Sequence, residues 1–173
     1  MASNQPTQAV DVILSDTINI PEPGSYVSGT NSNTGTTLDD AGATFKDGQT
    51  NAAGTGYYNR VSPGDVVYEP STGTIAQVIT VDSNIKLTLS APGLTGGGAA
   101  YDIYRGNGGA NNLKSGNEGF SLFVGTAGDL TVIPASSENP VVLKNVGNNS
   151  YVPLQVIRVF ASGTSAADIL ALR

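Results

Sequence analysis

The chain contains no cysteine, no histidine and no tryptophan. Without cysteine, neither disulfides nor thiolate metal sites can stabilise the fold. Hydrolytic enzymes commonly use histidine as the general base, cysteine as the nucleophile or a pair of carboxylates, and the first two are excluded here by composition. Aspartate and glutamate are the groups left to consider for catalysis or cation binding.

Charge is also scarce. Charged residues make up 13% of the 173 residues, and the chain instead holds 22 glycines with many Thr, Ser and Asn. The usual charged fraction is about 25%. A polar but weakly charged surface can approach a second copy without desolvating many ions, which favours subunit packing. A single β domain with neutral loops is the alternative interpretation.

The sign and spread of the charges argue against two kinds of partner. The formal net charge is −6, and the eight Lys and Arg residues are scattered between positions 46 and 173. Binding to a phosphate backbone requires a basic patch, so we expect no nucleic-acid partner. The start of the chain lacks the pattern of a secretory signal and no apolar run approaches 18 residues, so we expect cytoplasmic synthesis and no membrane partner.

Short β-branched runs and turn-forming residues predict an all-β protein, an antiparallel β-sandwich or barrel. A single helical turn is expected at 165–168, and residues 1–8 are expected to be a flexible arm or a strand that pairs only on a partner. Hairpin turns are expected at 125–128 and 147–150. The expected strands are 9–14, 17–20, 43–45, 65–68, 74–81, 85–89, 99–104, 119–124, 129–133, 141–146, 152–160 and 169–172.

Three stretches of the last third carry a recognisable pattern: Phe123 to Val132, Val142 to Val146, and Arg158 to Leu172. They resemble a family of small tailed-phage virion proteins, found in phage and gene-transfer particles as head-spike bases or capsid decoration (cement) proteins. Members of that family carry "YVGTAGDV", then "V-x-F-K-N-V", then "R-V-x-A-x-G-T-x-A-x-D-I-x-A-L". A short stretch just before Pro21 also resembles the family. The resemblance implies a virion protein, assembled in the host cytoplasm, that forms homo-oligomers, with a trimer as the first expectation, and docks on the major capsid protein.

The family resemblance appears before Pro21, is interrupted, and returns at Phe120, which indicates a discontinuous domain. We expect a β-sandwich base of residues 1–30 and 117–173, with a β-meander or small barrel of residues 31–116 inserted between Gly-rich flanks. The inserted part is similar to a module of many phage virion proteins. Its matching residues are Leu38 to Phe45, Gly64 to Val67 and Tyr101 to Tyr104.

The candidate interface combines this resemblance with one strand pattern. Apolar side chains fall on both faces of the strand 152–160, so it is either central in a sandwich or covered by a neighbouring subunit. The Gly-Thr pairs at 125–126 and 163–164 mark turns near subunit contacts, or turns that the monomer alone requires. The expected interface residues are Phe123, Gly125, Thr126, Val156, Val159, Phe160, Gly163 and Thr164.

One group of acidic residues is a candidate for chemistry. Asp39 and Asp40 are adjacent in a Gly-rich loop and, with Asp47, supply oxygen ligands for a cation, but a solvated turn is the favoured interpretation. We expect no catalytic, metal or cofactor site, and hence no enzyme.

The alternative function is a neck, tail or carbohydrate-binding adhesion module of the virion. It rests on Tyr57, Tyr58, Tyr101 and Tyr104, which can stack on a glycan, although tyrosines on alternating strands are more often core and rim residues. Aromatic platforms for glycans normally include tryptophan, and the chain has none, which argues against this alternative.

Overall fold

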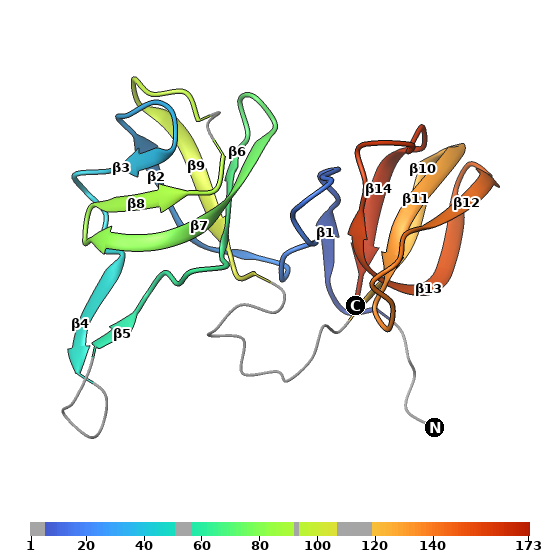
Figure 1. Ribbon diagram of the computed structural model, residues 1–173, viewed down its shortest axis with the longest axis horizontal. Coiled ribbons are helices and arrows are strands. Elements are labelled where there is room, and N and C mark those ends of the chain that lie inside the picture. The colour runs from blue at the N-terminus through green and yellow to red at the C-terminus, as the bar shows by residue number, and fades with distance from the viewer. Residues whose placement is uncertain (1–5, 51–56, 92–93, 107–118) are drawn as a thin grey trace. The chain divides into compact units, whose positions relative to one another are not determined.

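The computed structural model describes residues 6–50, 57–91, 94–106 and 119–173, without the side chains of 47–50 and 57–59. The prediction of an all-β fold is confirmed: the described residues form fourteen strands, arranged in two six-stranded antiparallel sheets and one two-stranded sheet (Figure 1). In this described part, no helix is long and apolar enough to cross a membrane.

The chain divides into two compact units. Met1–Gly24 and Lys114–Arg173 form the first, here called the terminal unit, and Ser25–Leu113 form the second, the inserted unit. The expected division had placed the same two boundaries at 30/31 and 116/117.

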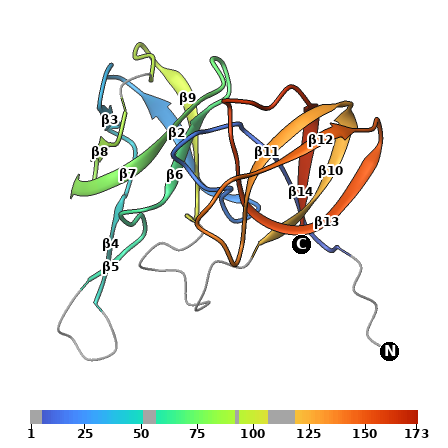
Figure 2. The same ribbon diagram turned by 45° about the vertical axis from the view of Figure 1, so that its right-hand side comes forward.

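The terminal unit contains one sheet in the order β1-β14-β10-β13-β11-β12. The central strand β13 pairs through its first half with β10 and through its second half with β11, and Figure 2 shows these strands curling around a shared interior. The core consists of buried aliphatic residues and Phe120. The strands are β1 (Ala9–Asp11), β10 (Phe120–Thr126), β11 (Gly128–Pro134), β12 (Val141–Val146), β13 (Ser150–Val159) and β14 (Ala167–Leu172).

The two hairpin turns predicted in this unit are wrong. Strands β10 and β11 flank the turn at 125–128, yet β13 lies between them in the sheet, and β12 and β13 likewise are not neighbours. Val124 on β10 lies opposite Ser150 on β13, and Gly128 on β11 lies opposite Val146 on β12. Neither stretch therefore folds its two flanking strands back onto each other. Turn chemistry is local, whereas strand pairing depends on which long-range registers bury the apolar face.

The predicted helical turn at 165–168 is also wrong, because its residues are bonded to a neighbouring strand instead of to each other. The hydroxyl of Ser165 accepts a hydrogen bond from the amide of Asp129, and the amides of Ser165 and Ala166 donate to the carbonyl of Asp129. Asp168 lies inside strand β14, where it has a positive φ of 53°.

The start of the chain pairs with its own C-terminus. The amides of Thr7 and Gln8 donate to the carbonyl of Arg173. The expectation of a strand that pairs only on a partner is therefore wrong for Thr7 and Gln8, and residues 1–5 lie outside the described part. The predicted strand 17–20 does not form, although Ile18 and Ile20 are buried and the amide of Ile20 donates to the carbonyl of Ile157.

The inserted unit contains a sheet in the order β2-β9-β6-β7-β8-β3. The meander β6–β7–β8 and the closing strand β9 lie where the β-branched runs predicted them. The sheet curls so that its two edges approach each other: the amide of Ser32, just after β2, donates to the carbonyl of Asp39 on β3. The strands are β2 (Ser25–Asn31), β3 (Thr37–Asp39), β4 (Lys46–Thr50), β5 (Tyr57–Asn59), β6 (Val66–Glu69), β7 (Thr74–Ser83), β8 (Lys86–Leu89) and β9 (Ala99–Tyr104).

The Gly- and Thr-rich stretch 29–56 was expected to be loop with one strand at 43–45. Instead it holds β3, β4 and the end of β2, and residues 43–45 are not a strand. Phe45 is fully buried in the core of this unit, and its amide donates to the carbonyl of Asn84. One large apolar side chain anchors the segment, while polar side chains such as Asn31 satisfy the backbone around it.

Candidate functional site: an exposed polar corner of the terminal unit

The motif stretches of the last third meet at one corner of the terminal unit. This motif corner consists of residues 125–129, 144–149 and 163–168. Its two sides are in close contact at glycine: a Cβ atom at Gly128 would lie 2.3 Å from the amide nitrogen of Ala166, and one at Gly125 would lie 2.8 Å from the Cβ of Asp168. Both glycines are therefore required by close packing of the backbone.

Asp129 is the hydrogen-bonding centre of the motif corner. Its backbone bonds to Ser165 and Ala166, at 2.9 to 3.1 Å. Its carboxylate accepts hydrogen bonds from the ammonium of Lys144 at 2.6 Å and from the amide of Asn145 at 3.0 Å. Lys144 and then Asn145 are the main causes that lower the pKa of Asp129 below its ordinary value. One residue thus joins all three segments of the corner.

Hydroxyl groups make further cross-links. The amide of Thr131 donates to the Oγ1 of Thr164 at 3.0 Å, and the Oγ1 of Thr131 donates to the carbonyl of Gly163 at 2.9 Å. The hydroxyl of Thr126 donates to the carboxylate of Asp168 at 2.5 Å. These bonds connect the segments that hold the two Gly-Thr pairs, which lie far apart in the sequence.

The backbone of the motif corner is unusual. Among the described residues, the three non-glycine residues with positive φ are Asn145, Asn149 and Asp168, at 52°, 52° and 53°, and all three belong to this corner. Asn and Asp tolerate this conformation better than other side chains, but it still costs free energy and persists only where the surroundings hold it. The corner is therefore a preorganised surface, which itself loses little conformational entropy on binding.

The chemistry available at this corner is that of a contact surface. Thr126, Lys144, Asn148, Gly163 and Ser165 are exposed, and they present hydroxyl, amide and ammonium groups together with backbone. The carboxylate of Asp129 is already bonded to Lys144 and Asn145, so it is not poised as a free base. These groups can donate and accept hydrogen bonds at the surface of the unit.

The structure separates the eight expected interface residues. Val156 and Val159 belong to the terminal unit's own core, with 0% and 1% exposure, so the expectation that they face a partner is wrong. The strand with apolar residues on both faces is central in its sheet, the other alternative that the sequence left open. Phe123, Gly125, Phe160 and Thr164 are half-buried, and Thr126 and Gly163 are exposed.

Sequence reasoning missed Asp129, Lys144, Asn145, Asn149 and Asp168 as members of this corner. The signals were present: Asp129 and Asp168 are charged residues within motifs, and Asn residues stand beside predicted turns. What was not visible was that the three segments meet.

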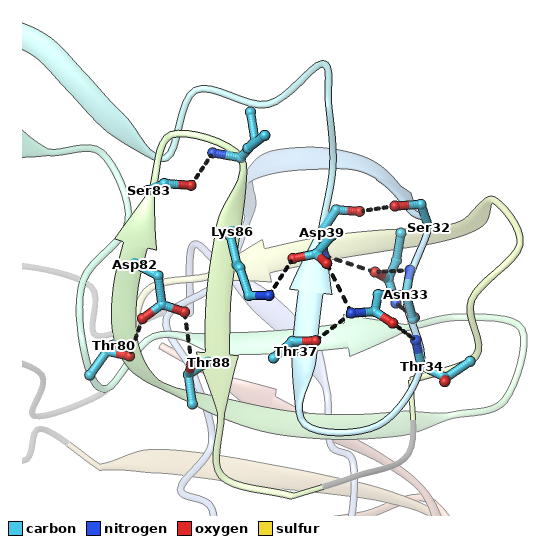
Figure 3. Close-up of polar contacts among 12 residues, drawn as sticks. Ser32, Asn33, Thr34, Thr37, Asp39, Thr80, Asp82, Ser83, Lys86 and Thr88 are labelled. Atoms are coloured by element: carbon cyan, nitrogen blue, oxygen red, sulfur yellow. Dashed lines mark hydrogen bonds and ion pairs between the residues drawn. The ribbon is translucent and has the colours of Figure 1, made fainter.

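Asp39 and Asp40 do not form a joint site. Asp40 is 9% exposed and accepts hydrogen bonds from the hydroxyl of Tyr101 and the amide of Gly42, both at 2.8 Å. The neighbouring Asp39 belongs to a different face, where it contacts Asn33 at 2.9 Å and Lys86 at 3.6 Å (Figure 3). The side chain of Asp47 lies outside the described part, and the described residues hold no cluster of three or more potential metal ligands.

Two further carboxylates are buried in the inserted unit, and both are occupied by internal donors. Asp65, 2% exposed, accepts from the hydroxyl of Tyr26, the amides of Ser62 and Gly106, and the guanidinium of Arg105 at 3.1 Å. Burial, followed by the bond to Asp65, raises the pKa of Tyr26 above its ordinary range. This cluster stabilises the unit.

Glu69 plays a similar part. It is 1% exposed and accepts from the amide of Thr95 at 2.8 Å and from the hydroxyls of Thr95, Ser71 and Thr72. Burial raises the pKa of Glu69, but the hydrogen bonds outweigh burial and leave the pKa below its ordinary value of 4.5. The carboxylate therefore stays ionised and fastens the loop at Thr95 to the end of β6.

The tyrosines do not form a stacking platform in the described part. Tyr101 is 2% exposed, and its ring is tilted against Phe45 at a centroid distance of 6.4 Å. Tyr104 is half-buried, and the side chains of Tyr57 and Tyr58 lie outside the described part. Tyr101 is therefore a core residue, as the commoner interpretation of the pattern had it.

Comparisons with known proteins found no relative of this chain. No protein-family model, no curated protein and no solved structure matches this chain. The motif corner, the low charge and the internal engagement of the buried carboxylates are the observations on which a function can be argued.

Proposed function

We propose that this chain is a non-enzymatic structural protein of a tailed-phage virion, a capsid decoration or head-spike-base protein that forms homo-oligomers and docks on the major capsid protein. One observation carries the proposal. The two stretches that resemble such proteins, Phe123 to Val132 and Arg158 to Leu172, pack on each other as one preorganised and exposed corner.

Burial and charge support a structural role over a catalytic one. Asp40, Asp65 and Glu69, the buried carboxylates of the described part, each accept at least two hydrogen bonds from the chain itself. An acid or base in an active site must instead reach a substrate. In this proposal the protein works in the assembled particle, with neither a cofactor nor a metal ion.

The composition fits a protein that is packed between other proteins. A charged fraction of 13% leaves few ions to be desolvated when subunits associate. The exposed groups of the motif corner offer hydrogen bonds to a capsid surface, and the net charge of −6 argues against a contact with packaged nucleic acid.

The first test is the mass of the purified chain by light scattering, followed by electron microscopy of the same species with and without empty capsids. We expect an oligomer that decorates capsids. Ala127→Lys should reduce decoration, because Ala127 is exposed within the motif corner. Ser136→Lys is the matched control, an exposed residue of the same unit outside the corner. Intact particles that contain no copy of the chain would contradict the proposal.

One observation favours the second candidate, a glycan-binding adhesion module in the neck, tail or head. The strands β3, β8 and β7 carry a row of polar side chains on one face, with Asp39, Lys86, Thr88 and Asp82 among them (Figure 3). Hydrogen bonds from Thr80 at 2.7 Å and Thr88 at 2.8 Å lower the pKa of Asp82 and keep it charged. A glycan array without a binder above background would remove this candidate.

A further inference from the structure

The outer strands of the two six-stranded sheets differ in how their free edges are protected. β1 and β3 have only three residues each. β2 has seven, but the carboxylate of Asp40 accepts from the amide of Thr30, and the carbonyl of Asp39 accepts from Ser32, so this edge is covered. Short strands and covered edges are the usual protections against pairing with another chain.

Strand β12 lacks these protections. It has six residues, and within the described part it has a neighbour, β11, on one side only. Val141 and Val142 are 41% and 48% exposed, a large exposure for side chains of this type. Its single charged residue, Lys144, is already paired with Asp129 at 2.6 Å.

The register shows which backbone groups of β12 point to the free edge. Val142 lies opposite Thr131 of β11. The amide of Thr131 donates to Thr164 and its carbonyl accepts from the amide of Phe160, so both groups of Thr131 point away from β12. Opposite residues of this kind form a non-hydrogen-bonded pair, in which the amide and carbonyl of each residue point outward. The amide and carbonyl of Val142 therefore face the open edge.

We propose that a second copy of this chain pairs with β12 through its own β12, antiparallel and about a two-fold axis at Val142. Because the outward groups belong to Val142, the two copies of Val142 would exchange two backbone hydrogen bonds across the axis. The amide of each Lys144 would face the carbonyl of the second copy's Pro140. The contact joins the two sheets at their β12 edges.

The charges of Lys144 and Glu138 favour this register and a second copy of the chain as the occupant. With Val142 on the axis, the two Lys144 residues stand four residues apart, about 13 Å at 3.3 Å per residue, which exceeds the Debye length of about 8 Å at physiological salt. Each Lys144 then approaches the exposed Glu138 of the second copy. With the axis at Leu143, the two lysines would be only about 7 Å apart and would repel each other.

This inference rests on the homo-oligomer part of the proposed function and on no other part of it. A two-fold contact builds dimers or other even-numbered assemblies. It therefore competes with the expectation of a trimer, and the solution mass distinguishes the two.

The first experiment is sedimentation of the full chain over a range of concentrations. We expect a monomer–dimer equilibrium for the wild type, and a dissociation constant raised at least about tenfold by Val142→Lys, because like charges would stand opposite each other on the axis. Ile79→Lys is the matched control: Ile79 is also 48% exposed, but its strand β7 has neighbours on both sides. Circular dichroism checks that both variants are folded.

The second experiment uses the absence of cysteine from the chain. A Val142→Cys variant places two thiols on hydrogen-bonded partners, whose Cα atoms are about 5.5 Å apart, within the disulfide range of about 4.4–6.8 Å. Mild oxidation should give a covalent dimer with this variant and none with Ile79→Cys. Equal cross-linking of both variants would overturn the inference.

The outcomes separate the inference from the proposed function. Dimers that cross-link through position 142 but ignore capsids would support the inference and refute the docking role. An oligomer that decorates capsids and is unaffected by Val142→Lys would refute the inference alone. In a third outcome, the wild type is monomeric in solution and binds capsids, and Val142→Lys abolishes that binding. This would show that the edge accepts another protein's strand, which also overturns the inference.

Discussion

The terminal unit and the inserted unit have main sheets of equal strand number but place their carboxylates differently. In the inserted unit Asp40, Asp65 and Glu69 are buried, whereas in the terminal unit the buried polar residues of the described part are Ser121 and Thr131. The carboxylates of the terminal unit that make hydrogen bonds, such as Asp16 and Asp129, lie at or near the surface.

The difference follows from the loops of each unit. The inserted unit has long connections rich in Gly, Thr and Asn, and its buried carboxylates accept from backbone amides there: Asp40 from Gly42, Asp65 from Ser62 and Gly106, and Glu69 from Thr95. Each carboxylate thus supplies the acceptor that a neighbouring strand would otherwise provide. The terminal unit meets the same need with hydroxyls and with Asp129 at an exposed corner, which leaves those groups at or near the surface.

Asp65→Ala should have the largest effect on stability, and it tests whether a buried carboxylate stabilises the inserted unit alone. The change leaves the buried donors of Tyr26, Ser62 and Gly106 without their acceptor and Arg105 without its counter-charge. We expect a loss of about 3–5 kcal/mol in the free energy of unfolding of the inserted unit. Hydrogen exchange, followed in peptides of each unit, should show the loss in residues 25–106 and not in 119–173. Asp11→Ala, at an exposed position of β1, is the control.

Gly128→Ala is the corresponding change in the terminal unit. The new Cβ would clash with the backbone of Ser165 and Ala166, at 2.5 and 2.3 Å, so we expect a loss of about 1–3 kcal/mol in stability and a displaced motif corner. Gly147→Ala is the control, since a Cβ there would meet only the hydroxyl of Ser150, at 3.1 Å. Thermal unfolding of the two variants measures the difference, and equal losses would contradict the close packing at Gly128.

An effect of intermediate size is expected in the pH dependence of stability, to which the buried Glu69 of the inserted unit contributes. The pKa of Glu69 is lowered in the folded state, so its ionised form adds stability above its ordinary pKa of 4.5, and this stability disappears as the pH falls through the folded-state value. Glu69→Gln should therefore reduce stability at neutral pH and flatten its decline in acid. Chemical denaturation at several pH values measures both. Parallel acid curves for the wild type and the variant would show that Glu69 contributes nothing to the decline.

The smallest effect is expected from Lys86→Ala. The ammonium of Lys86 lies 3.6 Å from Asp39, and the two side chains are 44% and 31% exposed. Ion pairs of this kind contribute about 1 kcal/mol or less. Urea denaturation should place the variant within that range of the wild type, at low and at high salt. A larger loss would mean that the outer face of the inserted unit also depends on its charges.

Strand positions were predictable where β-branched residues form dense runs. The strands at Ala99–Tyr104 and Val141–Val146 begin and end at the residues that the sequence indicated. The strands β2, β3 and β4, by contrast, contain Gly, Asn, Asp and Lys, which are depleted in strands. Bonds to the side chain of Asn31 help to hold β2 and β3 together. Local propensity could not reveal them because the bonds come from residues that meet only in the folded unit.

The candidate site was half predictable for a related reason. Thr126 and Gly163 were named from their motifs and lie exposed at the motif corner, whereas Val156 and Val159 were named from a strand pattern and lie in the core. An apolar side chain on a strand is equally suited to a core and to a subunit contact. Only the position of β13 between β10 and β11 decides between them.

By itself, the sequence determined the all-β class, the bounds of the strands densest in β-branched residues and the absence of histidine and cysteine chemistry, because these depend on residue type and short-range geometry. The tertiary structure decided which strands pair across each turn and which carboxylates are buried. It also brought Asp129, Asn145 and Asp168 to one corner and left the edge of β12 open. These features depend on contacts between residues far apart in the chain, and many registers satisfy the same local pattern until one of them buries both cores.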